Sequence, residues 1–521
     1  MDIFPVKSTE NPRLRRNSGP VVVVGAGMGG LAAAIRLAAA GLPVTLIDAG
    51  AEPGGKMRTT PSAAGPVDSG PTVLTMRAVF DDLFEAAGAR LEDHLRLIPL
   101  DVLARHYWSD GSTLDLHPDA TRNEAAIRAF AGAGAAAEFR AFTAQAQTLR
   151  MAFEAPVMNA PRPDLAGLTA AALAAPRLWR ALAERLGPNL RRHFSDPRLR
   201  QLFGRYATYV GGLPGQVPAV LGLIWDVEQQ GVWAVQGGMA RLAQALTRLA
   251  EALEVQRLAN TRVTGIDAPD GVVRGVRLNS GMALPCQSVV FNGDPAALGA
   301  GLLGLDPLSA VPARGTSPRS LSARVWAFAA RPQGLDLALH TVFFADAEAA
   351  EFGPLARGLH PVDPTIYVCA QDRAAGVPEG PERFEMILNA PPLPHAAPDD
   401  PEEAMKCRQM TFQRLARFGL SFDALPDPTS LTRPQDFARM FPSSAGSLYG
   451  RSPAGTLASF HRPTARTRIR GLYLAGGGVH PGAGVPMATL SGRHAAEAIM
   501  KDRGLTSSSR PMAMPGGMST A

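Results

Sequence analysis

The sequence predicts an α/β fold in which a domain built on a parallel sheet is joined to a second, mixed α+β domain. Three observations lead to this prediction: a strand–glycine loop–helix–strand unit near the N-terminus, a strand–glycine loop–helix unit near the C-terminus, and a long region of short strands and helices between them. The length of 521 residues is too great for one simple core, which also favours two domains. Because the glycine-rich units lie at opposite ends of the chain, we expect the first domain to be discontinuous.

The N-terminal unit has the order of elements of a dinucleotide-binding site. Val21–Val24 is a β-branched run typical of a buried strand, and the motif Gly25-x-Gly27-x-x-Gly30 follows it directly. An Ala-rich helical stretch then ends near Gly41, and Val44–Ile47 predicts a second strand that ends at Asp48, 18 residues past the last glycine of the motif. A glycine motif alone is weak evidence, but this context is the Rossmann-like fingerprint.

The residues of this loop predict how a dinucleotide would bind. Gly25 permits a tight turn, Gly27 lets the backbone approach a pyrophosphate, and Gly30 lets the helix pack against the strand. The helix N-terminus then stabilises the phosphates. We include Gly29 of the same loop among the cofactor-binding residues. Asp48 is expected to accept hydrogen bonds from the adenosine ribose, and it would repel a 2′-phosphate, which disfavours NADP.

Two later segments indicate which dinucleotide binds. The sequence EPGGKMR contains the doublet Gly54-Gly55, and VDSGPT contains Gly70-Pro71-Thr72. Both segments resemble flavoproteins of the amine-oxidase and carotenoid-desaturase superfamily, which implies FAD and further backbone N–H groups for its phosphates. That family usually has Arg after the doublet, whereas this chain has Lys56, with Arg58 two positions on. Lys cannot make a forked contact to phosphate, so either residue remains a candidate for the phosphate contact.

The C-terminal unit predicts a second loop that faces the cofactor. Residues 471–475 read as a strand, 476–484 form a glycine-rich loop, and Pro486 suits the first turn of a helix that runs to about Met500. In the family that the sequence resembles, the N-terminus of this helix points at the flavin and stabilises negative charge on the reduced ring. The cofactor-binding residues expected here are Gly476, Gly477, Gly482, Gly484, Val485, Pro486 and Met487.

His480 lies inside this loop and has three possible roles. A metal ligand is disfavoured, because no partner residues lie at metal-binding spacing in the sequence, and we expect no metal. A general base remains open, and His480 is the only residue we name as a catalytic candidate. The favoured role is positional, with His480 and Pro481 shaping the loop beside the flavin.

The middle of the chain predicts a helical segment over residues 136–200. Apolar residues recur at helical spacing in 136–155, and 176–192 combines an apolar face with several arginines. Such helices suit a membrane surface, and the alternative is an ordinary helix that faces the core. Residues 255–291 alternate as strands, with Asp270-Gly271 and Ser280-Gly281 as hairpin turns.

These elements give a complete division of the chain. We expect a tail at 1–18 and a disordered tail at 504–521. The FAD-binding domain is assigned to 19–75, 236–312 and 455–503, and the substrate domain to 76–235 and 313–454.

The resemblance of residues 20–503 is to carotenoid desaturases of the bacterial phytoene-desaturase family. Within it, HPGAGVPMATLSG, TVFFADAEAAEFGPLARG and PTIYVCAQDR resemble the hydroxyneurosporene (methoxyneurosporene) desaturase branch of purple photosynthetic bacteria. This implies an FAD-dependent enzyme of carotenoid biosynthesis that desaturates an acyclic carotenoid. The expected reaction is 3,4-desaturation of a 1-hydroxycarotenoid, of the 1-hydroxyneurosporene to demethylspheroidene type, by hydride transfer to flavin.

Several alternatives stay open at the level of sequence. Within enzymes they are a phytoene desaturase and an FAD-dependent carotenoid isomerase or saturase. A soluble amine oxidase is disfavoured, because an aromatic cage for a small amine is expected and none flanks the C-terminal motif. A flavin-free lipid-binding protein of the GDP-dissociation-inhibitor type has a similar fold, but the phosphate-binding glycines here are complete.

Composition sets limits on partners and location. The net charge is +6, but no Lys/Arg block exceeds two residues, so we expect no nucleic-acid partner. The three cysteines are far apart and suit a reducing compartment. No apolar run is long enough to span a membrane, and Arg15-Arg16 before the first strand only mimics a twin-arginine signal. We therefore expect a peripheral membrane protein on the cytoplasmic side, with a membrane surface as partner and a quinone or oxygen as electron acceptor.

Overall fold

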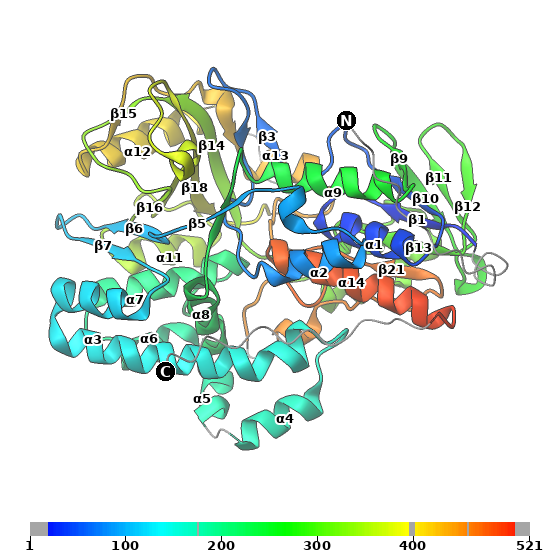
Figure 1. The fold of residues 1–521 in the computed structure, drawn as a ribbon, viewed down its shortest axis with the longest axis horizontal. Helices are drawn as coiled ribbons and strands as arrows, with labels where there is room; N and C mark the ends of the chain where they lie inside the picture. The colour runs from blue at the N-terminus through cyan, green and yellow to red at the C-terminus, as the bar shows by residue number, and fades with distance from the viewer. Residues whose placement is uncertain (1–18, 175–176, 395–401, 456–457, 506–521) are drawn as a thin grey trace.

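The computed structural model describes residues 19–174, 177–394, 402–455 and 458–505. The expected N-terminal tail, 1–18, and residues 506–521 of the expected C-terminal tail lie outside the described residues. Two sheet-based bodies lie side by side with a layer of helices below the second one (Figure 1). No helix among the described residues is long and apolar enough to cross a bilayer.

The first body is built on a five-stranded sheet whose paired neighbours all run parallel. Its strands, in spatial order, are β21 (Leu472–Leu474), β13 (Ser288–Phe291), β1 (Val21–Val24), β2 (Val44–Ile47) and β9 (Gln256–Leu258). The expected strands β1 and β2 have the predicted bounds. Strands from three distant parts of the chain meet in this sheet.

Helices cover one face of this sheet (Figure 1). They are α1 (Met28–Ala39), α2 (Ala78–Ala86), α9 (Ala240–Ala252) and α14 (Val485–Asp502). The helices α1 and α14 touch through small residues, because a Cβ on Gly492 would lie 2.3 Å from the carbonyl oxygen of Gly29. This close packing sets the first turn of α1 against the middle of α14.

The strands expected over 255–291 divide between two sheets. The turns at Asp270-Gly271 and Ser280-Gly281 connect β10 (Val263–Asp267), β11 (Gly275–Leu278) and β12 (Ala283–Pro285) into an antiparallel sheet. The last expected strand, β13, instead leaves this meander and pairs with β1 and β21. The strand β9 at the start of this range also lies in the parallel sheet. The strand β13 is buried on both faces, which suits a central parallel strand.

The second body contains a seven-stranded mixed sheet. Its strands, in spatial order, are β20 (Leu431–Thr432), β14 (Ser322–Ala330), β18 (Glu382–Ala390), β17 (Ile366–Ala370), β16 (His340–Phe343), β6 (Ala104–Tyr107) and β7 (Thr113–Leu116). On β18, Phe384, Met386 and Leu388 pack in a core with side chains of α12 (Glu403–Arg417). The alternate residues Glu385, Ile387 and Asn389 face the interior between the two bodies.

The helical layer begins with α3 (Ala120–Phe153), which contains most of the expected helix 136–155. The apolar residues that predicted it are all buried, namely Phe139, Phe142, Ala146, Leu149 and Phe153. They pack against the protein's own core, so this face is not available to a membrane surface. The expected helix over 176–192 is two helices, α5 (Arg177–Ala183) and α6 (Leu186–His193), and the side chains of 171–179 lie outside what is described.

The remaining elements complete the two bodies. They are β3 (Thr59–Thr60), β4 (Val67–Asp68), β5 (Leu97–Pro99), η2 (Glu154–Met158), α4 (Leu165–Ala174), α7 (Pro197–Gly204), η3 (Arg205–Val210), η4 (Ala219–Gly222), α8 (Leu223–Gln229), β8 (Trp233–Val235), α10 (Ala296–Gly299), β15 (Pro332–Gln333), α11 (Glu348–Ala356), β19 (Ser421–Phe422), η9 (Pro428–Ser430) and α13 (Pro434–Met440).

Candidate cofactor and substrate site

The first glycine loop is held to the second strand by Asp48. The Asp48 carboxylate accepts hydrogen bonds from the backbone N–H of Ala26, at 2.6 Å, and of Gly50, at 2.7 Å. Gly25 has a φ of +102°, so it needs the freedom of glycine at the turn. The loop is therefore fixed between β1 and α1, with the Asp48 carboxylate at its side.

The Gly54-Gly55 doublet lies directly against this loop. The N–H of Gly54 donates to the carbonyl of Ala26 at 2.8 Å, and Gly27 and Gly54 form a parallel bridge. Both glycines of the doublet have positive φ angles, +117° and +62°. Two backbone segments far apart in the sequence thus present N–H groups to one place.

The C-terminal loop closes the same place from the opposite side. A Cβ on Gly29 would lie 2.5 Å from the backbone nitrogen of Gly476, so α1 and the loop before α14 approach as closely as glycine allows. The helix α14 begins at Val485, with Pro486 in its first turn as expected. Two helix N-termini therefore converge on one site, and their partial positive charges favour an anionic ligand there.

Asn292 is a residue of this site that the sequence did not reveal. Its amide donates to the carbonyl of Gly25 at 3.1 Å, and it fills the space beside Gly27, Gly29 and Gly30. The available signal was its place directly after the buried strand β13, at the edge of the sheet where ligands of parallel sheets bind.

A single cavity of about 1060 Å³ connects these loops with the interior between the two bodies. The predicted cofactor residues that line it are Gly25, Gly27, Gly29, Asp48, Gly54, Gly55, Lys56, Gly70, Pro71, Thr72, Gly476, Gly477, Gly482, Gly484, Val485, Pro486 and Met487. Gly30, Arg58 and His480 are not among its lining residues. Gly30 instead supports the loop, because a Cβ there would lie 2.0 Å from the carbonyl oxygen of Gly25.

Lys56, and not Arg58, is the cation that faces the cavity. The Lys56 ammonium donates to the carbonyl of Leu448, and burial lowers its pKa to about 8. The Arg58 guanidinium points toward the second body, where it donates to the hydroxyl of Thr432 at 2.7 Å. Arg462 is a second buried cation on the cavity wall, and it donates to the carbonyl of Gly477 at 2.9 Å.

His480 faces away from the cavity and holds two segments together. Its Nε2 lies 2.9 Å from the carbonyl oxygen of Ala160, and its ring stacks on that of His494 at 5.9 Å. Burial lowers the pKa of His480, which favours the neutral imidazole. This geometry matches a positional role.

The rest of the cavity is mainly apolar. Apolar side chains on its wall include Phe153, Val157, Leu182, Val220, Ile224, Val325, Ile387 and Phe460. Polar side chains form two groups, one on the sheet of the second body and one on η3 and α8. On the sheet, Glu385 is fully buried, and neither of its carboxylate oxygens has a hydrogen-bond partner among the described residues. Burial raises the pKa of Glu385 well above its ordinary value.

The second polar group comes from η3 and α8. Arg205 donates to the Tyr209 hydroxyl at 2.7 Å, and Tyr206 donates to Glu228 at 2.7 Å. Burial raises the pKa of Glu228. Arg205, Tyr209 and Glu228 all line the cavity.

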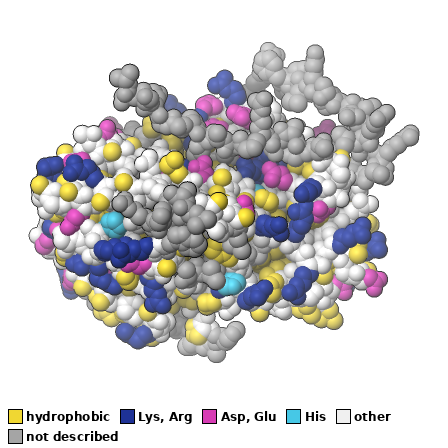
Figure 2. Space-filling model, turned by 90° about the horizontal axis from the view of Figure 1, so that it is seen from below, with side chains coloured by type: hydrophobic (Ala, Val, Ile, Leu, Met, Phe, Trp, Pro, Cys, Tyr) yellow, Lys and Arg dark blue, Asp and Glu magenta, His cyan; other side chains and the backbone are white. Residues whose placement is uncertain are grey.

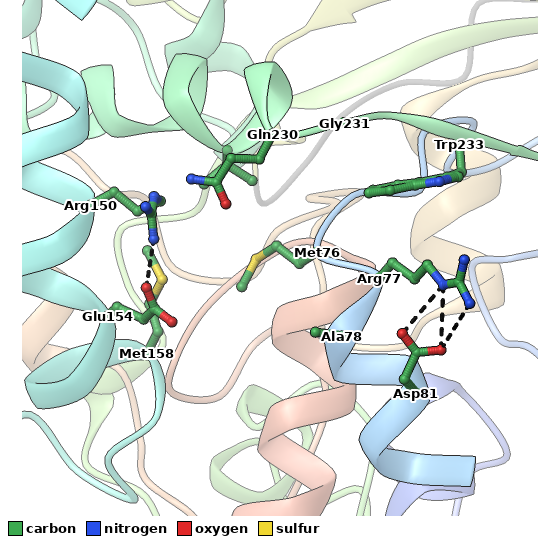
Figure 3. Close-up of a pocket in the computed structure, with 11 residues that line it drawn as sticks. Met76, Arg77, Ala78, Asp81, Arg150, Glu154, Met158, Gln230, Gly231 and Trp233 are labelled. Carbon is green, nitrogen blue, oxygen red and sulfur yellow. Dashed lines mark hydrogen bonds and ion pairs between the residues drawn. The ribbon is translucent and has the colours of Figure 1, made fainter. Parts of the chain in front are cut away.

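A smaller pocket of about 250 Å³ adjoins the cavity and shares Met76, Met158 and Val227 with it. Figure 3 shows Met76 between two ion pairs, with Met158 beside one of them. One is Arg150–Glu154, at 2.6 Å, and the other is Arg77–Asp81, at 3.3 Å. The pocket lies between Met76 and the C-terminal end of α3, which contributes Arg150 to its lining.

The donor and acceptor set fits FAD. Glycine N–H groups, the N-terminus of α1 and Lys56 suit a diphosphate, the N-terminus of α14 suits the flavin ring, and Asp48 suits a ribose. The buried ammonium of Lys56 has only a carbonyl acceptor among the described residues, which favours a bound anion. The described residues contain no group of three His, Cys, Asp or Glu side chains placed to hold a metal.

Comparison with known proteins agrees with this geometry. Residues 28–324 and 407–500 match the family model described as flavin containing amine oxidoreductase. The chain is 58% identical to the hydroxyneurosporene desaturase of Cereibacter sphaeroides, over 92% of this chain and 97% of that protein. It is 54% identical to the hydroxyneurosporene desaturase of Rhodobacter capsulatus, over 94% of this chain and 99% of that protein. The solved structure of wild-type putrescine oxidase bound to putrescine matches with a TM-score of 0.58 at 15% identity, covering 93% of this chain and 99% of that one.

Proposed function

This chain belongs to the hydroxyneurosporene desaturase branch of the flavin-containing amine oxidoreductase family, and from that premise we propose that it desaturates an acyclic hydroxylated carotenoid with FAD as cofactor. The proposed reaction is 3,4-desaturation of a 1-hydroxycarotenoid. The observation that carries it is the continuity of the cavity. One space contains the dinucleotide loops and extends as a mainly apolar channel along the sheet of the second body.

The chain's own residues explain how such a reaction would proceed. When bound, FAD supplies the oxidant that takes a hydride from an allylic carbon of the substrate. The apolar wall, with Val325 and Ile387 on the sheet and Ile224 opposite, excludes water and aligns a rigid polyene. The N-terminus of α14 favours the negative charge that the reduced cofactor carries.

A proton must leave the adjacent carbon as the double bond forms, and Glu385 is suited to accept it. It faces the cavity without a hydrogen-bond partner among the described residues, and its pKa is raised by burial. A carboxylate with a raised pKa is a better match to proton transfer near neutral pH than an ordinary one. The hydride and the proton together account for both hydrogens removed and for the new carbon–carbon double bond.

The proposed function also includes a membrane surface on the cytoplasmic side, from which the apolar substrate enters, and reoxidation of the flavin by oxygen or a membrane quinone. The cavity wall supports this entry side, because Leu182 on its wall belongs to α5, which lies with α4 at the bottom of Figure 1. Figure 2 views the molecule from that side and shows basic side chains among apolar ones. Met151 is 65% exposed near the same edge.

The membrane proposal is tested with vesicles of phosphatidylethanolamine and phosphatidylglycerol. The double variant Met151→Glu/Arg180→Glu is expected to sediment with them less than the wild-type protein, because it removes an exposed apolar side chain and a basic charge. The matched control is Leu425→Glu/Arg331→Glu, which makes the same changes at exposed positions around β15 and β19. Equal sedimentation of both variants would contradict this entry side.

The reaction itself is tested by anaerobic mixing of the purified FAD-loaded protein with 1-hydroxyneurosporene, neurosporene or phytoene in detergent. We expect the flavin absorbance to bleach with 1-hydroxyneurosporene and the polyene absorbance to shift to longer wavelength. Bleaching with phytoene alone would indicate a phytoene desaturase. A change in polyene geometry without net flavin reduction would indicate an isomerase.

A further inference from the structure

Three polar side chains interrupt the apolar wall of the cavity at one place. Arg205 and Tyr209 come from η3, and Glu228 comes from α8. The Arg205 guanidinium donates to the Tyr209 hydroxyl at 2.7 Å, and Glu228 accepts from Tyr206 at 2.7 Å. A charged guanidinium and a carboxyl group are costly to keep inside an apolar channel, so their presence needs a physical reason.

These groups retain capacity to bind a ligand. Arg205 has five N–H donors, and the contact to Tyr209 is its only hydrogen bond among the described residues. Its side chain keeps accessible surface although it lies deep between the two bodies, because that surface faces the cavity. The Glu228 carboxylate likewise has more acceptor sites than its tyrosine neighbours use.

The cluster is connected to the segment that contains Gly70-Pro71-Thr72. The Arg205 guanidinium lies 5.4 Å from the centre of the Tyr367 ring. The hydroxyl of Tyr367 lies 2.6 Å from the hydroxyl of Thr72, a predicted cofactor-binding residue. The polar cluster is therefore near the place where the cofactor and the reacting bond of the substrate are expected to meet.

We propose that Arg205, Tyr209 and Glu228 form the subsite that binds the hydroxyl group of the carotenoid and so select a hydroxylated substrate. This inference rests on the proposed function, and it adds which residues recognise the hydroxyl group of the substrate. In a 1-hydroxycarotenoid the hydroxyl lies only a few bonds from the bond to be desaturated. A subsite beside the cofactor segment is thus in the right place to hold that end of the polyene.

The chemistry of the subsite predicts an order of ligands. A hydroxyl donates to Glu228 and accepts from Arg205 or Tyr209, so both partners are satisfied. A methyl ether still accepts but no longer donates. A hydrocarbon end leaves the buried polar groups unpaired, and sites built for hydrogen bonding discriminate strongly against ligands that lack the group.

The test measures binding without turnover. The FAD-loaded protein is reduced with dithionite, so that it cannot accept a hydride, and is titrated with 1-hydroxyneurosporene, its methyl ether or neurosporene. Binding is followed by quenching of tryptophan fluorescence by the polyene.

The variants are Tyr209→Phe and Glu228→Gln, which keep the size of each side chain. The control is Tyr107→Phe, which removes a tyrosine hydroxyl that donates to the carbonyl of Asp336 outside the cavity.

We expect the wild-type protein to bind the hydroxylated carotenoid about 10-fold or more tightly than neurosporene, with the ether between them. Each cavity variant should lose part of that preference, because the hydroxyl loses a partner, while its flavin content stays the same and its affinity for neurosporene does not fall. Tyr107→Phe should keep the preference. If Glu228→Gln does not fold, the result for Tyr209→Phe tests the proposal, because this variant keeps the ring and removes only the hydroxyl oxygen.

Two failures are distinguishable. If both cavity variants keep the preference, or lose affinity for all three carotenoids equally, the subsite is wrong while the desaturase function stands. A wild-type protein that desaturates 1-hydroxyneurosporene and neurosporene but binds them equally would also overturn the proposed subsite and leave the desaturase function standing. If the wild-type protein neither binds nor desaturates any acyclic carotenoid, the proposed function itself fails.

Discussion

The Nε2 atom of His480 lies 2.9 Å from the carbonyl oxygen of Ala160, a residue 320 positions earlier in the chain. This hydrogen bond joins the C-terminal glycine loop to the segment that follows η2. Two residues of η2, Val157 and Met158, line the cavity. The ring of His494, stacked on His480, approaches the neighbouring carbonyl of Asn159 at 3.3 Å. The histidine near the cofactor loop is therefore a link between the cofactor site and the substrate channel.

His480→Ala tests this link. We expect the free energy of unfolding to fall by about 1–3 kcal/mol, because the Ala160 carbonyl loses its donor and the buried imidazole ring is removed. Amide exchange of residues 154–160 should become faster. His480→Gln should recover part of both effects. A variant His480→Ala with unchanged stability and exchange, but with turnover about 10²-fold lower or worse, would instead indicate a chemical role.

Gly29→Ala tests the contact between the two helix ends. The added methyl would lie 2.5 Å from the nitrogen of Gly476, so the loop must move, at a cost of about 1–3 kcal/mol. We expect flavin content to fall strongly, measured as the ratio of flavin to protein absorbance. The control Gly134→Ala adds a methyl in α3 with no atom within 4 Å and should keep its flavin.

Lys56→Met and Arg58→Met separate the two candidate phosphate contacts. Loss of the cavity-facing ammonium should weaken FAD binding by about 10-fold to 100-fold, whereas Arg58→Met should leave FAD affinity unchanged because Arg58 contacts Thr432. Equal losses in both variants would show that Arg58 also reaches the cofactor. The measurement is a titration of the flavin-free proteins with FAD.

The pKa of Lys56, lowered to about 8, also predicts a pH dependence. The ammonium that attracts the diphosphate is present below this pKa and lost above it, so FAD affinity should fall as the pH rises from 7 to 9. Lys56→Arg carries a charge that does not titrate in this range and should remove the dependence. Affinity that rises with pH would contradict the assignment.

Glu385→Gln tests the proposed proton acceptor. The variant keeps the shape of the side chain but cannot take a proton, so the rate of flavin reduction by substrate should fall by about 10²-fold or more. Flavin content and carotenoid affinity of the reduced protein should not change. Rapid-mixing absorbance measures the rate. If the rate of flavin reduction is unchanged, or if the variant loses carotenoid affinity and not rate, Glu385 is not the proton acceptor.

His106 gives a prediction for acid stability. It is buried, its ring stacks on Phe344, and burial lowers its pKa to about 4. In the unfolded chain a histidine titrates near 6.5, so between these values the unfolded state binds more protons and the folded state loses stability as the pH falls. His106→Phe keeps the stacking and removes the titration. From pH 6.5 to 4, wild type should lose about 3 kcal/mol relative to the variant in urea unfolding; a pH-independent difference would contradict this.

The local patterns of the sequence were sufficient for much of the fold and the cofactor site. The strands β1 and β2 have the predicted bounds, and α14 begins at Val485 with Pro486 in its first turn. These features were predictable because strand composition, glycine turns and helix starts depend on residues that are close together in the sequence. The glycine motifs also line one cavity as a group.

Other features depended on contacts between distant residues. Asn292 and Arg462 reach the cofactor loops only because the parallel sheet places β13 beside β1 and β21 beside β13. Glu385 and Arg205 face the cavity because of strand register and helix orientation, which composition does not reveal. The apolar face of 136–155 could not be assigned to membrane or core until its packing partners were known.

The central claim is that the protein desaturates a hydroxylated acyclic carotenoid, and pigment analysis tests it most directly. The chain is expressed in a carotenoid-producing host that accumulates phytoene, neurosporene or 1-hydroxyneurosporene in turn, and the products are separated and identified by absorbance and mass. We predict loss of two hydrogens and a longer polyene from 1-hydroxyneurosporene, with phytoene unchanged. Desaturation of phytoene with the hydroxylated carotenoid left untouched would contradict the account.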